Sequence, residues 1–348
     1  MALRSTQIQV GLVGPETRAA WDAYVEHRPE ATLFHRRGWS DVLARTFGYR
    51  DCGLMATHDE ETRGVLPLLL VRNLPTGRSL VSTPFGVYGG IFADDDETAR
   101  RLLDAAQGWG ERLGVRYVEL RQSRPLGGLP EKDLYVTFRR PILPTADENM
   151  ALIPRNQRRS IRVAQKHGLT SRVGQSELLD PFYHVYSQSV RNLGTPVFPK
   201  RLFAELLREF GDGCRILGVY HEGRMVAGVL TFLFRDQVMP YYGGAVREAF
   251  RLAANDFMYW SLMTYGMEQG YRVFDFGRSK VDSGSYHFKR HWGFAPTPLP
   301  YQYVLVRQRS IPDLSPRNPR FAAAIRVWQR IPLGLTQWIG PKVVRYFP

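Results

Sequence analysis

The amino-acid sequence predicts an α+β protein made of two similar halves, each a mixed, mostly antiparallel sheet flanked by helices. Its 348 residues suit two domains of ordinary size better than one. The order of helices, an antiparallel hairpin, a strand, a helix and a strand occurs twice along the chain. Strands and helices in such an order form layered α+β domains. We expect an N-terminal domain over residues 1–144, a second domain over 145–310 and an amphipathic C-terminal extension over 311–348.

The first half begins with two helices and a hairpin. Trp21, Tyr24 and Val25 share one face of the first helix, and Gly48 ends the second. Residues 79–96 contain a proline and three glycines, which predict a strand broken by turns. A run of acidic residues then precedes a helix, where carboxylates complement the helix dipole. The expected elements are helices over 15–28, 35–48 and 97–114, a hairpin over 53–73, and strands over 79–96, 116–122 and 134–143.

The second half repeats this order from about residue 145. Its first helix is basic and ends at Gly168, and a later hairpin turns at the HEGR sequence of residues 221–224. The expected helices cover 151–168, 180–194, 199–211 and 253–270, and the expected strands cover 169–174, 214–223, 224–236, 238–246, 273–277 and 301–306.

The last segment, residues 321–348, is apolar, aromatic and basic. One interpretation is a helix packed on the second domain. The other is an interfacial amphipathic element that touches anionic lipid. Pro332 and Gly334 interrupt the segment, which argues against one continuous membrane helix.

The composition limits the class of protein. With 44% hydrophobic and 23% charged residues, the sequence is typical of a soluble globular chain. It has no apolar run near the ~18 residues of a membrane span and no secretory signal. Two cysteines indicate no disulfide framework, so we expect a cytoplasmic protein, with peripheral contact with the inner membrane left open. The net charge of +14 favours polyanionic partners, such as nucleic acid, activated precursors or an anionic membrane.

Residues 271–303 concentrate the reactive side chains of the chain. The strand sequence VFDFG leads into a Ser/Gly-rich turn and then into the cationic, aromatic segment SYHFKRHWGF. Loops held by a rigid scaffold are common sites of chemistry. We therefore expect the functional site here. The histidines of this stretch, His287 and His291, are interpreted as structural.

Two residues of this stretch are candidates for catalysis. Asp275 lies between two phenylalanines on a strand, where its carboxylate could deprotonate an attacking amine. The alternative is a structural aspartate bonded to the turn amides of Gly277 and Arg278. Lys289 is the stronger candidate, because a fixed ammonium could stabilise an oxyanion or hold a phosphate. Its alternative is a solvent-facing lysine at a turn.

A basic helix forms a second candidate site. Its five cations recur at spacings of three and four, so they share one face without an interleaved acid. Arginine binds phosphate well through its planar fork. The alternative is an ordinary solvated surface. The expected substrate-binding residues are Arg155, Arg158, Arg159, Arg162 and Lys166 of this helix, together with Tyr242, Arg278, Ser279, Lys280, Ser285 and Tyr286.

Several catalytic signatures do not occur in the sequence. There is no GxGxxG after a strand, no GxxxxGK[ST], no GxSxG and no HExxH. These absences argue against a nucleotide hydrolase, a Rossmann dehydrogenase, an α/β-hydrolase and a metallopeptidase. They leave open a transferase that works by positioning two substrates.

The chain resembles the FemAB family of acyltransferases over residues 20–310. The family has two tandem GNAT-like (acyl-CoA N-acyltransferase-like) domains, and its FK-x-[FW]-G-type segment is similar to Phe288–Phe294, FKRHWGF. The sequences TLFHRRGWSDVLARTFG, LVSTPFGVYGGIFADD, YYGGA and FDFGRSK resemble a subgroup associated with exosortase (PEP-CTERM) systems of exopolysaccharide-producing bacteria.

The resemblance implies transfer of an acyl or aminoacyl group to an amine of a cell-envelope precursor. It places Lys289 at the reaction centre and compares the basic helix with an Arg-rich helix of the family. It implies no tightly bound cofactor and no metal, with acyl-CoA or aminoacyl-tRNA as the donor. The partners it implies are a nucleotide- or lipid-linked sugar or peptide acceptor and tRNA. REAFRLAAND lacks the glycines of the usual GNAT pyrophosphate loop, and no long heptad stretch forms a coiled-coil arm.

Two other functions remain open from the sequence. A scaffold protein of exopolysaccharide assembly could keep the fold without catalysis, because fold does not fix function. A nucleic-acid-binding protein would explain the positive charge and would lose affinity steeply with salt.

Overall fold

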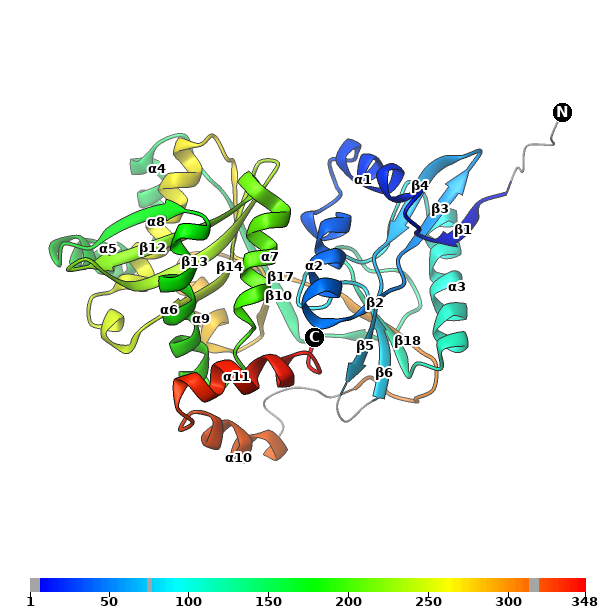
Figure 1. The fold of residues 1–348 in the computed structure, drawn as a ribbon. Coiled ribbons are helices and arrows are strands. Elements are labelled where there is room, and N and C mark those ends of the chain that lie inside the picture. Colours follow the sequence, from blue (N-terminus) through cyan, green and yellow to red (C-terminus); the bar gives the residue numbers. More distant parts are fainter. Residues whose placement is uncertain (1–6, 74–76, 313–318) are drawn as a thin grey trace. The chain divides into compact units, whose positions relative to one another are not determined.

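The computed structural model describes residues 7–73, 77–312 and 319–348, and its contacts divide the chain into two compact units (Figure 1). Unit 1 comprises residues 1–134, 299–314 and 345–348. Unit 2 comprises residues 135–298 and 315–344. Residues 1–6 of the expected first domain and 313–318 of the expected extension lie outside the description.

Unit 1 has two sheets and one long helix, which follows the last strand of the first sheet in the sequence and precedes a strand of the second. The four-stranded sheet has the order β1-β3-β4-β7, and the six-stranded sheet has the order β2-β5-β6-β8-β18-β9. Leu102 and Ala106 of the long helix pack into the core with Leu54 and Val118. The strands are β1 (Gln9–Leu12), β2 (Arg50–Asp51), β3 (Leu54–His58), β4 (Glu61–Leu66), β5 (Leu69–Asn73), β6 (Gly77–Val81), β7 (Phe92–Ala93), β8 (Tyr117–Arg121), β9 (Glu131–Lys132) and β18 (Tyr301–Leu305). The helices are α1 (Arg18–His27), α2 (Arg37–Phe47) and α3 (Asp96–Leu113).

The helix boundaries of unit 1 follow from local chemistry. Asp95 caps α3, its side chain accepting a hydrogen bond from the Thr98 amide, and Asp96 and Glu97 occupy the first turn. Gly48 and Gly114 end α2 and α3 with φ of 70° and 63°, the left-handed region that glycine adopts without steric cost. The predicted helix positions are confirmed here.

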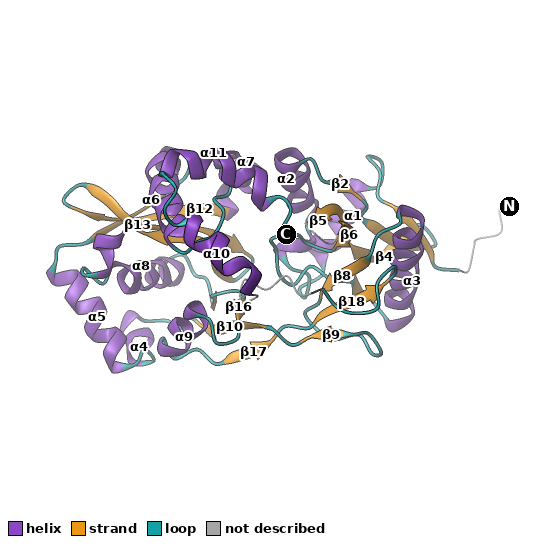
Figure 2. Cartoon of the chain, turned by 90° about the horizontal axis from the view of Figure 1, so that it is seen from below, coloured by secondary structure: helices purple, strands orange, loops and turns teal. Residues whose placement is uncertain are grey.

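Unit 2 is one mixed sheet covered on both faces (Figure 2). Its strand order is β11-β12-β13-β14-β15-β10-β16, with β17 paired to β10. The strands are β10 (Tyr135–Pro141), β11 (Thr170–Gly174), β12 (Cys214–His221), β13 (Arg224–Phe234), β14 (Gln237–Ala245), β15 (Val273–Asp275), β16 (Ser279–Lys280) and β17 (Pro296–Pro298). The helices are α4 (Ala146–Ala151), α5 (Arg155–Lys166), α6 (Leu179–Asn192), α7 (Lys200–Phe210), α8 (Ala254–Glu268), α9 (Gly284–His291), α10 (Pro319–Trp328) and α11 (Leu333–Val344).

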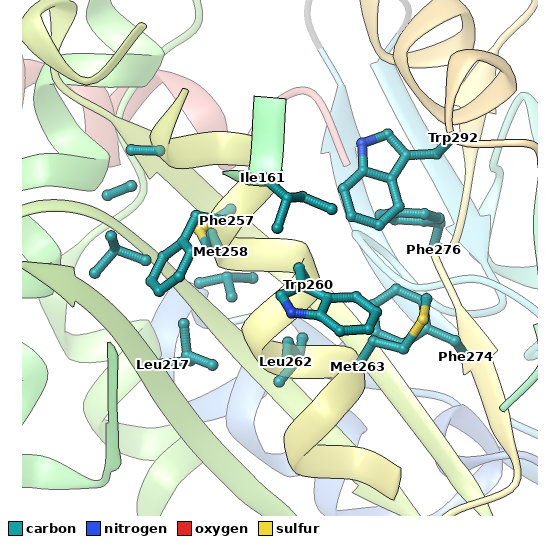
Figure 3. Packing of buried hydrophobic residues seen from close by; sticks show 14 of the residues in the cluster. Ile161, Leu217, Phe257, Met258, Trp260, Leu262, Met263, Phe274, Phe276 and Trp292 are labelled. Atoms are coloured by element: carbon teal, nitrogen blue, oxygen red, sulfur yellow. The ribbon is translucent and has the colours of Figure 1, made fainter. Parts of the chain in front are cut away.

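The core of unit 2 lies between the sheet and α8. Phe257, Met258, Trp260 and Met263 belong to one cluster with residues of β12, β13 and β15. Figure 3 shows them with Leu217 of β12 and Phe274 of β15. Helix α8 is apolar nearly all round because α5 packs against it as well, through residues that include Ile161. On the other face of the sheet, α6 packs against β13 and β14, and α7 packs against β12. The α+β class with mixed sheets and flanking helices is confirmed.

Two strands differ from the sequence expectation in their partners. The segment 134–143, expected to close the first half, forms β10, which pairs with β15, β16 and β17 of unit 2. The segment 301–306, expected beside the site, forms β18, which pairs with β8 and β9 of unit 1. Alternating side chains show that a strand has a buried face, but they do not identify a partner more than a hundred residues away.

One helical region differs from expectation, and the C-terminal segment is interrupted where the sequence predicts. Residues 284–291, expected as part of a turn, form α9, with the Ser283 side chain as the N-cap. The C-terminal segment forms two helices, α10 and α11, on either side of Pro332. Within the described ranges, none of the helices is long and apolar enough to cross a bilayer.

Candidate functional site

Strands β14 and β15 part at the centre of the unit 2 sheet. They pair in parallel only at Gln237↔Val273 and Val238↔Phe274. Beyond these pairs β14 continues to Ala245, while β15 ends at Asp275 and the following strand, β16, pairs with β10. Among the described strands, none pairs with this edge of β14 from Pro240 onward.

The turn after β15 lies beside this parting. Gly277 has φ of 63°, so the chain can reverse direction immediately after the strand. The Gly277 amide donates a 2.7 Å hydrogen bond to Oδ1 of Asp275. The Thr137 hydroxyl donates to the same oxygen over 3.4 Å, and Arg139 forms an ion pair with Oδ2 at 3.3 Å. The hydrogen bond to Gly277 is the one expected of a structural aspartate.

The Asp275 side chain is fully buried, so it does not reach solvent in this structure. A carboxylate in that position fixes the turn through Gly277 and anchors it to β10 through Arg139. Its expected role as a proton acceptor remains a prediction.

Lys289 enters the same turn from α9. Its Nζ donates hydrogen bonds to the carbonyl oxygens of Phe276 (2.7 Å), Gly277 (2.9 Å) and Arg278 (3.2 Å). An ammonium group has three donors, and three backbone carbonyls accept them here. The side chain is only 8% exposed, so the alternative of a solvent-facing lysine is wrong.

Burial lowers the pKa of Lys289 to about 7. The carboxylate of Asp275 opposes this shift, and the positive charge of Arg278 adds to it. Lys289 therefore changes charge near neutral pH while it holds the turn. Its expected role at an oxyanion remains a prediction.

The other expected residues of this stretch surround the turn. Arg278 is half-buried, with its guanidinium 4.5 Å from the ring centroid of Tyr135. Ser279 is buried in β16, and its hydroxyl has no hydrogen-bond partner. Lys280 and Tyr286 are half-buried, and the Tyr286 ring lies 5.6 Å from that of Phe138. Ser285 is exposed, with its hydroxyl 3.0 Å from that of Ser283.

Tyr242 lies on β14 where that strand has parted from β15. Its ring packs against Tyr186, Phe198 and Phe203, and its hydroxyl is buried without a hydrogen-bond partner. Burial raises the pKa of Tyr242 well above its ordinary value, and the positive charge of Arg278 opposes that rise. A buried, unpaired hydroxyl is a costly arrangement unless another group meets it.

The basic helix α5 is the second candidate site in unit 2. Its apolar face packs against α8, and the five expected cations lie on the opposite face, with Arg155, Arg159, Arg162 and Lys166 exposed and Arg158 half-buried. Within the described part of the chain, none of the five forms an ion pair with a carboxylate. Pro154, immediately before this helix, lies against Gly293, which follows α9, so the N-terminal end of α5 is near the end of α9.

Strand β10 supplies site residues that the sequence reasoning did not identify. Tyr135, Thr137 and Arg139 alternate along one face of the strand and contact Arg278 and Asp275. The alternation was visible in the sequence, but its partner strand was not. No group of three potential metal ligands occurs among the described residues.

Comparison with known proteins agrees with this fold. The family described as "Acetyltransferase (GNAT) domain" matches residues 155–290. The crystal structure of FemX is similar, with a TM-score of 0.68 and 17% identity over 86% of this chain and 98% of that chain. A search of curated protein sequences found no match.

Two further solved structures have the same fold. One is the C-terminal domain of a putative lysylphosphatidylglycerol synthetase from Agrobacterium fabrum, with a TM-score of 0.58 and 14% identity, covering 90% of this chain and 94% of that chain. The other is a tandem GNAT protein from the clavulanic acid biosynthesis pathway, with a TM-score of 0.55 and 10% identity, covering 87% and 100%. The chain therefore has the tandem GNAT-like fold of these structures, and its residues 155–290 match the model of the GNAT acetyltransferase domain.

Proposed function

We propose that this protein is an N-acyltransferase that moves an acyl or aminoacyl group onto an amine of a cell-envelope precursor, of an exopolysaccharide or peptidoglycan type. The observation that carries the proposal is the parting of β14 from β15 beside a turn that a buried lysine supports. The GNAT fold and the likeness to FemX support the same class of reaction.

The edge of β14 from Pro240 onward, which none of the described strands pairs with, is the proposed place for the acyl donor. The backbone N–H and C=O groups of a strand edge can bind an extended amide-containing chain. The acceptor nitrogen attacks the acyl carbonyl carbon, and a C–N bond forms. The C–S bond of a thioester or the C–O bond of an aminoacyl ester breaks, and the leaving group takes the proton that the amine loses.

In this proposal Lys289 and Asp275 position the turn, and the other predicted residues of the site meet the substrates. Lys289 and Asp275 fix the carbonyl and amide groups of residues 276–278. Arg278, Ser279, Lys280, Ser285 and Tyr286 line the acceptor side, and Tyr242 lies on the donor side. Orientation of two bound reactants can supply a large part of the acceleration without a covalent enzyme intermediate.

Both kinds of donor, acyl-CoA and aminoacyl-tRNA, are part of the proposal. The cation face of α5, residues 155–166, is the proposed contact for donor or acceptor phosphates. The acceptor is a nucleotide- or lipid-linked sugar or peptide. We further propose that the protein works in an exosortase-associated (PEP-CTERM) exopolysaccharide system, in the cytoplasm or at the inner-membrane face.

A direct transfer assay tests this function. The purified protein is incubated with an acyl-CoA set or charged tRNA and with amine-bearing nucleotide-linked sugars or peptides, and products are detected by mass spectrometry. We expect a mass increase of one acyl or aminoacyl group on the acceptor amine. Binding of an acceptor without transfer from any donor would favour the non-catalytic scaffold instead.

A further inference from the structure

We infer that the outward faces of α10 and α11 form a docking surface for an anionic lipid bilayer. The inference goes beyond the transfer reaction and does not depend on it. It starts from charge: residues 314–348 contain six Lys or Arg and no Asp or Glu. These cations are Arg317, Arg320, Arg326, Arg330, Lys342 and Arg345.

Helix α10 is fixed through one face and exposes the other. The Trp328 indole donates to the Thr195 carbonyl over 3.1 Å, and the Gln329 amide donates to the Asn192 carbonyl over 3.0 Å. On the outward side Val327 is 62% exposed, and helical spacing places it between exposed Arg326 and Arg330. The helix therefore presents an apolar residue with a cation on each side.

Helix α11 has the same two-faced character. Its inward face carries Thr336, Gly340 and Val344, and it packs on α6. A side chain at Gly340 would collide with the Val197 backbone, with a Cβ only 2.6 Å from the carbonyl oxygen. The docking is therefore close. The opposite face carries Leu335, which is 50% exposed, and Trp338, which is 63% exposed.

A cation accompanies the exposed tryptophan. The Nζ of Lys342 lies 3.6 Å from the centroid of the Trp338 ring. Leu193, at the C-terminal end of α6, is 71% exposed, and its neighbours Asn192 and Thr195 accept the hydrogen bonds from α10. Both helices therefore contact the same short segment, residues 192–197. In Figure 1, α11 lies at the lower end of α6 and α10 lies below α11.

The chemistry of this surface matches a membrane interface. Exposed Trp and Leu with flanking Lys and Arg are the pattern of helices that lie in the headgroup region. Tryptophan favours that depth, and each cation near an anionic surface adds to the attraction. A soluble partner protein would need complementary acids and a defined apolar pocket, whereas a bilayer needs only the apolar and cationic residues seen here. We name this surface, comprising Leu193, Arg326, Val327, Arg330, Leu335, Trp338 and Lys342, the lipid-facing surface.

Vesicle sedimentation tests the inference with the full-length protein. We expect binding to vesicles that contain phosphatidylglycerol, at least tenfold weaker binding to pure phosphatidylcholine vesicles, and loss of binding at high salt. The triple variant Val327→Ser/Leu335→Ser/Trp338→Ser and the triple variant Arg326→Glu/Arg330→Glu/Lys342→Glu should each bind at least tenfold more weakly.

Two control variants separate this surface from others. Phe250→Ser removes a side chain that is 65% exposed on a different segment, and it should bind like the wild type. Arg100→Glu/Arg101→Glu reverses the charge of two exposed residues on α3 and should retain most of the binding. Circular dichroism and thermal melting establish that each variant is folded.

Two results would overturn the inference. One is a wild-type protein that does not distinguish anionic from neutral vesicles. The other is a set of folded α10–α11 variants that bind as the wild type does. Because the readout is vesicle binding, neither result depends on acyl transfer, and a failed transfer assay leaves the lipid-facing surface intact.

Discussion

At the scale of single residues, Lys289 holds the turn of the candidate site in place through its ammonium group. Its three donors engage the carbonyl oxygens of Phe276, Gly277 and Arg278, which are the three residues of the turn after β15. Asp275 binds the same turn from the other end through the Gly277 amide. A displacement of about 1 Å in such a turn can cost on the order of a hundredfold in rate, so positioning alone gives these residues a large effect.

The first prediction concerns the pH dependence of stability. Burial lowers the pKa of Lys289 to about 7 in the folded protein, against ~10.4 in an unfolded chain. Between these values the unfolded chain binds more protons, so the free energy of unfolding rises with pH. We expect the difference in unfolding free energy between the wild type and Lys289→Met to grow in favour of the wild type across this range. Urea unfolding at several pH values measures it, and a constant difference would contradict the lowered pKa.

The second prediction separates charge from shape at Asp275. Asp275→Asn keeps an oxygen that can accept from the Gly277 amide but removes the carboxylate charge. If Asp275 only positions the turn, transfer should fall less than about tenfold, and Asp275→Ala should lose more. If the carboxylate removes the proton from the acceptor amine, Asp275→Asn alone should lose roughly a hundredfold or more. The kcat values of the two variants decide between these roles.

At the scale of elements, the segment of residues 82–91 in unit 1 has little room for additional atoms. Its residues are almost all buried, and Phe85 and Tyr88 have positive φ values of 60° and 56° without being glycines. A Cβ at Gly90 would lie 2.1 Å from Oε1 of Gln122, which is itself buried. Close packing therefore explains why glycine occupies these positions of the segment.

The third prediction tests that packing. Gly90→Ala should destabilise the fold by about 1–3 kcal/mol because the added methyl group forces the Gln122 side chain to move. Gly127→Ala is the matched control: a Cβ there meets no heavy atom within 4 Å, and the change should be small. Chemical denaturation of both variants measures the difference. Equal stability of the two variants would contradict the packing argument.

The fourth prediction concerns helix α5. Arg159 and Arg162 are exposed on its cation face, so their replacement should leave the stability of the fold nearly unchanged. If this face binds phosphates, Arg159→Glu/Arg162→Glu should weaken binding to RNA and make its dependence on salt shallower. Affinity measured at several salt concentrations tests this. If the dependence of RNA affinity on salt concentration were the same in this variant as in the wild type, the cation face would be an ordinary solvated surface.

At the scale of the whole molecule, the chain is not divided at one point. Strand β18, residues 301–305, follows the last strand of unit 2 but pairs between β8 and β9 of unit 1. Strand β10 precedes the helices of unit 2 and forms part of its sheet. The chain therefore passes from unit 1 to unit 2 and returns to unit 1 to add β18, although each unit has its own core.

The fifth prediction follows from this exchange. A fragment of residues 1–134 leaves an edge of β8 unpaired, and an exposed edge promotes aggregation. Addition of residues 299–306 through a flexible linker should restore a soluble, cooperatively unfolding fragment. Circular dichroism and sedimentation of both fragments measure the effect. A soluble and cooperative fragment of residues 1–134 alone would contradict it.

The sequence predicts local structure better than long-range pairing. The acidic first turn of α3 and the apolar face of α1 follow from composition and spacing, and they are confirmed. The cluster around Asp275 depends on Thr137 and Arg139, more than a hundred residues away, and no local pattern identifies such a pairing. The burial of Lys289 depends on α9, whose N-cap Ser283 lies in a turn-like sequence. That serine was the one local signal for the helix.

The central claim is acyl transfer at the turn that Lys289 supports, and kcat of Lys289→Ala tests it most directly. The matched control is Lys200→Ala, which removes a lysine that is half-exposed on α7. We expect the control to transfer at the wild-type rate and a folded Lys289→Ala protein to lose roughly a hundredfold or more in kcat. Wild-type turnover by folded Lys289→Ala would contradict the account.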